Sequence, residues 1–345
     1  MAESIDVPDA RRPALGRVLE ALDAARRVVL TTHVNADGDG AGSEAALAVW
    51  LAARGKTVAI VNPTPFPSTY LHLLADPAAV ADFGTGRAER ALRDADLVAV
   101  LDTSEPKRLG RMAKAVAERP AVVIDHHPPG EAIVVGPAVQ DPTACATGEL
   151  VFDLLRVADP DDAWPPAVAE AIYTAIVADT GSFRFSNTTP RAHAIAAELL
   201  RRGVDPEAVY RRLFATVPLG RIALLRAALD RLETDPEAHV TWIALPRSVL
   251  EPFNATAEDL DGVVDYARSI EGTEVAILLR ELPDASTKVS WRSNGEVDVN
   301  AIARKFGGGG HIKAAGALVG QPLDAAREAV LEATREAVRA LEKRP

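Results

Sequence analysis

The first part of the chain alternates between short apolar runs and longer helical patterns. Apolar runs rich in β-branched residues, each with the length of one strand, occupy residues 27–32, 57–62, 96–102 and 121–125. After the first run, a glycine-rich turn at 33–42 leads into a helical pattern at 42–55 that ends at Gly55. Apolar strands that alternate with helices predict a parallel sheet covered on both faces. In such a sheet the ligand site lies beyond the carboxyl ends of the strands.

Beyond residue 145 the pattern changes twice. Helical patterns dominate first, at 146–158, 166–178, 190–202, 205–214 and 218–233. Strand patterns then return at 239–245, 274–281, 286–292 and 313–319, with helices expected at 298–306 and 323–342. We therefore expect an α/β protein with three parts: an N-terminal parallel-sheet domain with helices on both faces (1–216), a helical linker (217–236), and a smaller C-terminal α/β domain with a mixed sheet (237–345).

Composition narrows the class of protein. The chain has 345 residues, of which 48% are hydrophobic, so it can bury a sizeable core. Met1 to Arg12 is polar and of mixed charge, unlike a signal peptide. No stretch approaches the roughly 18 to 20 apolar residues that a membrane span needs. The single cysteine, Cys145, precludes an internal disulfide and fits a reducing compartment. These features predict a cytoplasmic protein that does not bind membranes.

The net charge of −11 bears on the choice of ligand. Proteins that coat long nucleic acids are usually basic, because neutralising phosphates supplies much of their affinity. This chain is acidic, so a phosphate-rich substrate would need a local basic patch or bound cations. We therefore do not expect long duplexes as partners.

Aspartates and histidines gather where the predicted strands end. They are His33, Asp37 and Asp39 after the first strand, Asp102 after the third, Asp125, His126 and His127 after the fourth, and Asp179 at the end of a helix. Parallel strands end on one rim, so these side chains are expected to converge. Clustered carboxylates repel one another, and two divalent cations would balance the charges of Asp37, Asp39, Asp102 and Asp179. Carboxylate and imidazole ligands suit Mn²⁺, while Mg²⁺, Fe²⁺ and Co²⁺ also fit. The lack of cysteine ligands argues against a structural zinc site.

Each of these residues also has a plainer structural interpretation. An aspartate after a strand is commonly a turn or helix-capping residue, and the glycines at 38, 40 and 42 let the turn bend tightly. The joint occurrence of all four groups, in order, favours a site. Three other histidines, His72, His193 and His239, are expected to be structural, and Cys145 to be a small packing residue.

The same residues resemble the motifs of the DHH phosphoesterase family. Asp125-His126-His127 resembles the signature of that family, residues 33–43 its first motif, residues 101–104 its second and residues 178–187 its fourth. Residues 307–316 resemble the glycine-rich motif of the DHH-associated C-terminal domain. The match spans almost the whole chain. Length and the two-domain layout resemble the nanoRNase and 3′-phosphoadenosine 5′-phosphate phosphatase subgroup more than the larger RecJ-like exonucleases.

The resemblance implies a ligand set. One metal would be held by His33, Asp37 and Asp102, and a second by Asp39, Asp102, His126 and Asp179, so that Asp102 bridges them. Asp125 would orient a histidine from behind the ligands. His127 would lie close to the scissile phosphate and act in catalysis. The sequence departs from the family at Ala36, where proline is common, which affects only the rigidity of the loop.

The second domain carries the basic groups that the acidic chain otherwise lacks. The glycine run at 307–310 can turn amide groups toward an anion, and Arg292 can form paired hydrogen bonds with a phosphate. In the family this motif contacts the substrate phosphate, whereas a glycine run alone is often only a flexible loop. The predicted substrate-binding residues are Gly308, Gly309, Gly310, His311, Lys313 and Arg292, with Arg184 and Tyr70 as weaker candidates for phosphate and base contacts. Lys288 and Lys305 add positive charge nearby.

The sequence thus predicts a two-metal phosphoesterase that hydrolyses short oligoribonucleotides and dinucleotides and removes the 3′-phosphate of 3′-phosphoadenosine 5′-phosphate. Alternatives that stay open are a phosphodiesterase for cyclic di-AMP or other cyclic dinucleotides, a manganese pyrophosphatase, and a non-enzymatic nucleotide-binding regulator. The regulator would require an incomplete metal site. The helical region 190–233 can pack either a homodimer or only the core. The preferred substrate, the direction of attack and the physiological metal are not predicted.

Overall fold

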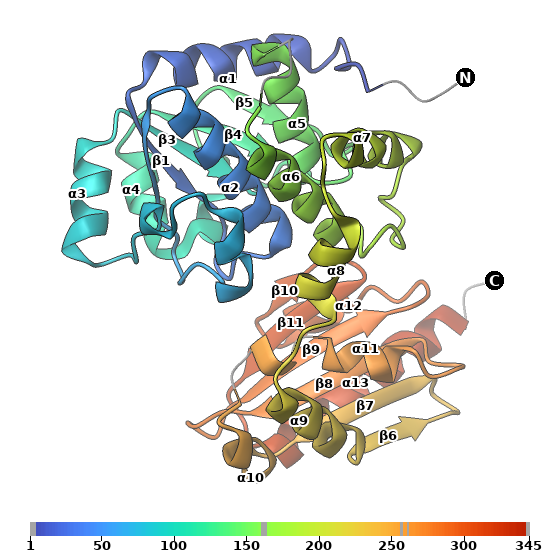
Figure 1. The fold of residues 1–345 in the computed structure, drawn as a ribbon. Helices are drawn as coiled ribbons and strands as arrows, with labels where there is room; N and C mark the ends of the chain where they lie inside the picture. Colours follow the sequence, from blue (N-terminus) through green and yellow to red (C-terminus); the bar gives the residue numbers. More distant parts are fainter. Residues whose placement is uncertain (1–4, 160–163, 256–257, 261, 343–345) are drawn as a thin grey trace. The chain divides into compact units, whose positions relative to one another are not determined.

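The computed structural model describes residues 5–159, 164–255, 258–260 and 262–342, and shows the α/β architecture that the sequence predicts. The chain forms two compact units, Met1–Ala215 and Thr216–Pro345 (Figure 1). The first four residues of the predicted polar N-terminus lie outside the described part. Within the described residues, every helix is too short or too polar to cross a membrane.

The described part of the N-terminal unit is built on a parallel sheet of five strands. They are β1 (Arg27–Thr31), β2 (Thr57–Ile60), β3 (Leu97–Leu101), β4 (Ala121–Asp125) and β5 (Ala138–Gln140). Their order is β2-β1-β3-β4-β5, and every neighbouring pair is parallel. The sequence predicted the first four of these strands. It missed β5, because three residues are too few to show a period.

The strand order reverses its direction between β1 and β3. From β1 the chain first adds β2 on one side, and then returns to add β3, β4 and β5 on the other. The connections on the two sides therefore diverge at the carboxyl ends of β1 and β3. In open α/β sheets this reversal is where ligands bind.

Helices cover both faces of this sheet. They are α1 (Arg12–Ala24), α2 (Gly38–Ala53), α3 (Gly86–Asp94), α4 (Ala113–Ala117), α5 (Thr147–Ala158), α6 (Pro166–Asp179), α7 (Pro190–Arg201) and α8 (Pro206–Phe214), with 3₁₀ turns η1 (Ser68–Leu73), η2 (Pro77–Ala79) and η3 (Pro106–Met112). The two faces alternate along each strand: Ala99 of β3 packs in a core with α1, α2, α5 and α6, whereas its neighbour Val100 packs in a core with α3, α4 and η3. The sequence did not predict α1, α3 or α4.

Helix α2 begins earlier than the sequence indicates. It starts at Gly38 and not at 42, because the Asp37 carboxylate caps the helix by accepting from the amides of Asp39 and Gly40, at 3.0 and 3.1 Å. The glycines at 38, 40 and 42 therefore lie within a helix and not in a bent turn. A Cβ at Gly42 would lie 2.7 Å from the carbonyl oxygen of Ala171 in α6. Close packing, more than turn geometry, requires this glycine.

The described part of the C-terminal unit contains a mixed six-stranded sheet. Its strands are β6 (Leu232–Asp235), β7 (Val240–Leu245), β8 (Val275–Glu281), β9 (Thr287–Ser293), β10 (Gly309–Gly310) and β11 (Ala314–Val319). The order is β10-β11-β9-β8-β7-β6, with only the pair β7 and β8 parallel. The mixed sheet that the sequence predicts for this region is confirmed.

The two faces of the second sheet are covered differently. Its helices are α9 (Leu219–Leu229), α10 (Arg247–Leu250), α11 (Val263–Arg268), α12 (Val299–Lys305) and α13 (Leu323–Glu342), with 3₁₀ turns η4 (Glu251–Phe253) and η5 (Glu258–Leu260). Helices α12 and α13 share a core with Trp291 of β9 and Ala317 of β11. Helices α9 and α11 pack on the other face, over residues of β7 and β8 such as Leu278. The helix predicted for 218–233 ends at Leu229, because Leu232–Asp235 pairs with β7 as an edge strand.

Candidate metal centre

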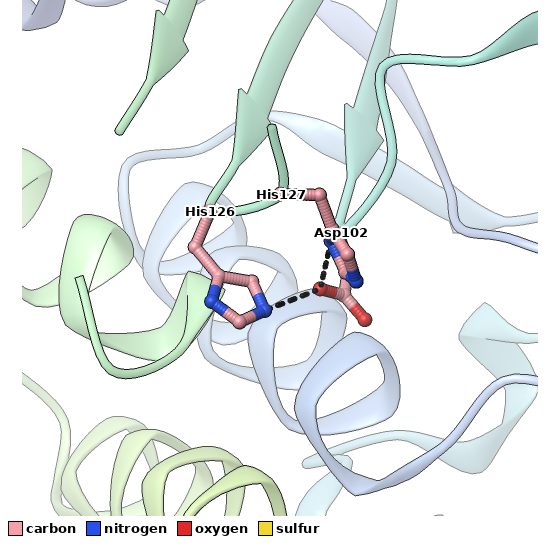
Figure 2. Close-up of side chains that lie close together, drawn as sticks. All are labelled: Asp102, His126 and His127. Atoms are coloured by element: carbon pink, nitrogen blue, oxygen red, sulfur yellow. Dashed lines mark ion pairs between the residues drawn. The ribbon is translucent and has the colours of Figure 1, made fainter. Parts of the chain in front are cut away.

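Asp102 lies at the centre of the polar cluster on the first sheet. It follows β3 directly, is almost fully buried, and has a φ of 60° that turns the backbone sharply. One carboxylate oxygen lies 3.2 Å from Nε2 of His33, and the other lies 3.6 Å from Nε2 of His126 and 3.6 Å from Nδ1 of His127. Figure 2 shows the last two contacts. Asp102 therefore faces residues that follow β1 on one side and β4 on the other.

One group of metal-type ligands lies on the β1 side of Asp102. Nε2 of His33 is 3.7 Å from the Asp37 carboxylate, in addition to its contact with Asp102. Ligand atoms of these three residues all lie within 4.8 Å of one another. The other ring nitrogen of His33 contacts the carbonyl oxygen of Val34 at 3.0 Å, which fixes the orientation of the ring. The three residues are close enough to share one cation.

A second group lies on the β4 side and comprises Asp39, His126 and Asp179. Nε2 of His126 is 3.7 Å from the Asp39 carboxylate and 3.6 Å from that of Asp179. The amides of Thr147 and Gly148, at the start of α5, donate to Asp39 at 2.7 and 2.9 Å. Asp39 is thus held by the N-terminus of a helix, where anions are stabilised.

Asp125 and His127 form a pair beside these two groups. Asp125 is fully buried and accepts hydrogen bonds from the amide and from Nδ1 of His127, at 3.0 and 2.8 Å. Burial alone would lower the pKa of His127, but the hydrogen bond with Asp125 and the charge of Asp102 raise it. The pair therefore presents an oriented imidazole with a raised pKa at the edge of the cluster.

The charges in the cluster perturb one another strongly. Burial and the charges of Asp102 and Asp179 raise the pKa of Asp39 well above its usual range. Burial raises the pKa of Asp179 to about 6, assisted by Asp102 and opposed by His126. Burial would lower the pKa of His33, but hydrogen bonds with Asp102 and Asp37 raise it to about 10. Protons thus offset the carboxylate charge, and divalent cations would do so more completely. The donor set of carboxylates and imidazoles fits such cations.

Several residues around the cluster escaped the sequence analysis. The Thr147 hydroxyl donates to Asp102 at 2.9 Å, and the Asn187 amide donates to Asp179 at 2.9 Å. The Gln140 amide donates to the hydroxyl of Ser104 and to the carbonyl of His127, at 2.8 and 3.0 Å. Thr147 stands at the start of a predicted helix, and Ser104 and Asn187 each end a stretch that resembles a family motif, but no role was predicted for any of them.

A buried network of ion pairs involves two acidic residues of α5, Glu149 and Asp153. Arg11, which is 6% exposed, contacts Glu149 and Asp153 at 2.6 and 2.7 Å, and Arg191 contacts the same two residues. Glu149 in turn accepts from the amide of Cys145 at 3.0 Å. This network holds the first turn of α5, whose amides bind Asp39. Cys145 itself is buried, as expected of a packing residue.

The two weaker candidates for substrate contacts, Tyr70 and Arg184, lie near the start of α2 and after the end of α6. A Cβ at Gly38 would lie 3.0 Å from the Tyr70 hydroxyl, so Tyr70 covers the start of α2. Arg184 follows α6, and its side chain donates to the carbonyl of Gly181 at 2.6 Å. Of the histidines expected to be structural, His193 stacks on Phe183 and His239 contacts the carbonyl of Gly272 at 2.9 Å. His72 contacts the carbonyl of Thr69 at 2.8 Å.

In the C-terminal unit, pairing of β9 with β11 brings the candidate residues together. Arg292 is the partner of Ala314, and the carbonyl of Ala314 accepts from the amide of His311 at 2.7 Å. The carbonyl of Lys313 accepts from the amide of Ser293 at 2.9 Å. Arg292, His311 and Lys313 therefore lie at one end of this strand pair.

The backbone of the glycine run, which was expected to turn its amides toward an anion, is in part hydrogen-bonded within the unit. The amides of Gly307 and Gly308 donate to carbonyls of α12, at 3.1 and 2.9 Å, and so end that helix. Gly309 and Gly310 form the short strand β10, which pairs with Gly316 and Ala315. The amide of Gly308 is thus occupied within the unit, and an anion site here depends mainly on the side chains of Arg292, His311 and Lys313.

Known protein families match residues in both the N-terminal and the C-terminal unit. A family model described as "DHH family, N-terminal domain" matches residues 27–176, and one described as "DHHA1 domain" matches residues 239–340. A Thermus thermophilus protein named bifunctional oligoribonuclease and PAP phosphatase NrnA is 36% identical over 93% of each chain. A Bacillus subtilis protein of the same name is 27% identical over 85% of this chain and 89% of its own. The crystal structure of an exopolyphosphatase-related protein from Bacteroides fragilis superposes with a TM-score of 0.89 and 26% identity, covering 96% of this chain and 98% of the other.

Proposed function

The chain belongs to the DHH phosphoesterase family, with a DHHA1 domain after its catalytic domain, and from this premise we propose that it is a two-metal hydrolase of short nucleotide substrates. Members of this family are hydrolases of phosphoric esters, and this chain is one of them. The proposed substrates are oligoribonucleotides of a few residues, cleaved to mononucleotides, and 3′-phosphoadenosine 5′-phosphate, which loses its 3′-phosphate. The names of the relatives support both substrates.

The observation that carries the proposal is the position of Asp102 between two ligand groups. Its two oxygens face His33 and His126, 3.2 and 3.6 Å away. We assign His33, Asp37 and Asp102 to one cation and Asp39, Asp102, His126 and Asp179 to the other. Mn²⁺ is the cation that this mixture of carboxylates and imidazoles suits best, and Mg²⁺, Co²⁺ and Fe²⁺ are alternatives. When bound, such a pair of cations supplies Lewis-acid stabilisation of phosphate charge and lowers the pKa of water.

The protein's own groups complete the chemistry. The Asp125 carboxylate holds Nδ1 of His127, which orients the ring at the edge of the cluster. Because the pKa of His127 is raised, its imidazolium can neutralise a phosphate oxygen or protonate the leaving oxygen. We therefore assign Asp125 as the positioning residue and His127 as the catalytic residue.

We assign substrate binding to the C-terminal unit. Arg292, His311 and Lys313 supply donors for a phosphate at the end of the β9–β11 pair, and the neighbouring backbone at Gly309 and Gly310 leaves room for close approach. In the N-terminal unit, Arg184 and Tyr70 are the further candidates for phosphate and base contacts.

A substrate panel assayed with Mn²⁺ tests the proposal. The panel contains dinucleotides, RNA of tens of nucleotides, 3′-phosphoadenosine 5′-phosphate, cyclic di-AMP and pyrophosphate. We expect release of mononucleotides from the dinucleotides and of phosphate from 3′-phosphoadenosine 5′-phosphate, with little cleavage of long RNA. Chelation of the metal and the His126→Ala variant should each abolish both activities.

Other outcomes separate the alternatives. Preferred cleavage of cyclic di-AMP would replace the proposal with a cyclic dinucleotide phosphodiesterase. Hydrolysis of pyrophosphate alone would indicate a pyrophosphatase. Nucleotide binding without any metal-dependent hydrolysis would leave a nucleotide-binding regulator and overturn the proposal.

A further inference from the structure

The polar segment that precedes α1 is fixed to the N-terminal unit. Val7 is buried in the same core as residues of α1 and α5, and the carbonyl of Asp6 accepts from the guanidinium of Arg191 in α7 at 2.8 Å. We call residues 5–11 the N-terminal strap. Its last residue, Arg11, sends its side chain into the unit, where it is nearly fully buried. The strap therefore contacts elements that come much later in the chain.

Arg11 contacts three carboxylates at once. Its guanidinium lies 2.7 Å from Asp141, 2.6 Å from Glu149 and 2.7 Å from Asp153. A guanidinium has five N–H donors, so it can serve several acceptors. Glu149 and Asp153 are themselves almost fully buried, and buried carboxylates are costly without a cationic partner. Arg11, together with Arg191, therefore supplies the positive charge that offsets these two residues inside the unit.

Glu149 connects Arg11 to the first turn of α5. One of its carboxylate oxygens contacts Arg11, and the other accepts from the amide of Cys145 at 3.0 Å, just before the helix. A single carboxylate therefore ties together the strap, the chain that enters α5 and the first turn of the helix.

The first turn of α5 in turn holds two of the candidate metal ligands. Ala146, at the N-cap position, has no side-chain group that could accept from the amides of this turn. The amides of Thr147 and Gly148 instead donate to Asp39, at 2.7 and 2.9 Å, and the Thr147 hydroxyl donates to Asp102 at 2.9 Å. A displacement of this turn would therefore change the position of both carboxylates.

The ligand group on the β1 side is held by other elements. The ring of His33 contacts the carbonyl of Val34, and the Asp37 carboxylate accepts from two amides at the start of its own helix, α2. In the part of the chain that the structure describes, neither of these residues contacts α5 or the strap. The group depends on α5 only through Asp102, which it shares with the β4 side.

We propose that Arg11 is a positioning residue for the cation on the β4 side: it holds Glu149 and, through Glu149, the turn of α5 that fixes Asp39. This inference rests on the metal assignment of the proposed function. It predicts that loss of Arg11 weakens binding of the β4-side cation far more than binding of the β1-side cation.

Two effects of removing Arg11 oppose each other. A full negative charge left on Glu149 would attract a cation, whereas a displaced turn would lower the affinity of the site for one. A buried carboxylate that loses its partner takes up a proton or moves toward water, so the first effect is small. Groups that support a metal ligand commonly contribute about 10- to 100-fold to metal affinity. We therefore expect a net loss of affinity.

Mn²⁺ titrations of single-site proteins test the proposal. His33→Ala leaves only the β4-side cation, and His126→Ala leaves only the β1-side cation, so calorimetry on each background gives one Kd. Arg11→Met keeps much of the aliphatic side chain and removes the charge. Added to His33→Ala, it should raise Kd by about 10- to 100-fold. Added to His126→Ala, it should change Kd by about twofold or less, because this group relies on α5 only through Asp102.

Two further variants separate positioning from general stability. Arg11→Lys keeps the charge with fewer donors, so it should restore part of the lost affinity. Leu15→Ala is the matched control, because Leu15 lies fully buried in α1, outside the ion-pair network, and its truncation lowers Tm through packing alone. With all titrations run below the Tm of each variant, Leu15→Ala should leave both Kd values unchanged. An equal loss in this control, or an unchanged or tighter β4-side Kd in Arg11→Met, would overturn the proposal.

These titrations contain no substrate, so they separate this proposal from the proposed function. A protein that bound both cations, lost the β4-side cation in Arg11→Met and yet hydrolysed no nucleotide would support the role of Arg11 while the proposed function failed. Two cations bound with the same affinities in every variant would overturn the role of Arg11 alone. A protein with residue 33 substituted that bound no Mn²⁺, with Arg11 present, would overturn the metal assignment and this proposal together.

Discussion

The two units place their charged residues in opposite surroundings. In the N-terminal unit Asp39, Asp102 and Asp125 are almost fully buried, and each is held by hydrogen bonds from fixed groups such as the amides of α5. In the C-terminal unit Lys288 and Arg292 lie at the surface of a sheet, half-buried or exposed. The groups proposed to bind metal are thus buried and held by hydrogen bonds, whereas those proposed to bind substrate lie at the surface of a sheet.

The largest effect is expected at Asp102. Replacing it with asparagine removes the charge shared by the two ligand groups and should lower kcat on the order of 10³-fold or more, since metal ions contribute several kcal/mol to such reactions. Asparagine tolerates the left-handed backbone, so Asp102→Asn should fold at φ 60° where Asp102→Ala is strained. Activity on dinucleotides and thermal unfolding are the measurements. A folded Asp102→Asn variant with full activity would contradict the bridging role.

Metal affinity should depend steeply on pH. The pKa of His33 is raised to about 10, so in the metal-free protein its ring carries a proton that a cation must displace. Because binding releases this proton and the proton concentration falls as pH rises, affinity should increase about tenfold per pH unit below the pKa of His33, or about 100-fold between pH 6.5 and 8.5. Mn²⁺ titrations by calorimetry in buffers of different ionisation enthalpy measure the released proton. An affinity independent of pH would show that His33 is not a ligand.

A smaller effect is expected from the group that holds Asp102. Thr147→Val removes the hydroxyl that donates to Asp102 and should reduce metal affinity or activity by tens of fold. Thr174→Val is the matched control, because the Thr174 hydroxyl is also fully buried but has no hydrogen-bond partner within the described structure. The control should keep full activity and equal or greater stability. Equal loss in both variants would attribute the effect to packing and not to the hydrogen bond.

The smallest effect is expected at Arg292, in the C-terminal unit. Arg292→Gln should raise KM for dinucleotides by about tenfold and leave kcat and metal affinity nearly unchanged, because this residue is proposed to bind substrate and is not among the proposed metal ligands. Steady-state kinetics together with a Mn²⁺ titration make the measurement. Loss of metal affinity in this variant would contradict the proposal that the N-terminal unit binds the metals and the C-terminal unit binds the substrate.

The sequence predicted the elements whose residues repeat a clear period. The apolar runs of β1, β3 and β4 and the helical patterns of α5, α6 and α7 were located to within one or two residues, because burial on both faces leaves a continuous signal. Elements with a weak period were missed, such as β5 with three residues and β6 at an edge. The start of α2 was misplaced, because the helix cap of Asp37 is a hydrogen-bond pattern and not a hydrophobic one.

The sequence by itself determined the types of candidate metal ligand, since aspartate and histidine follow strands β1, β3 and β4 and a parallel sheet gathers those strand ends. Only the tertiary structure decided which other side chains hydrogen-bond to these candidate ligands and position them. Arg11, near the N-terminus, steadies α5 through residues about 140 positions away, and Thr147 reaches Asp102 from another helix. A linear pattern records what each element buries, but contacts between distant elements arise only when the sheets and helices pack.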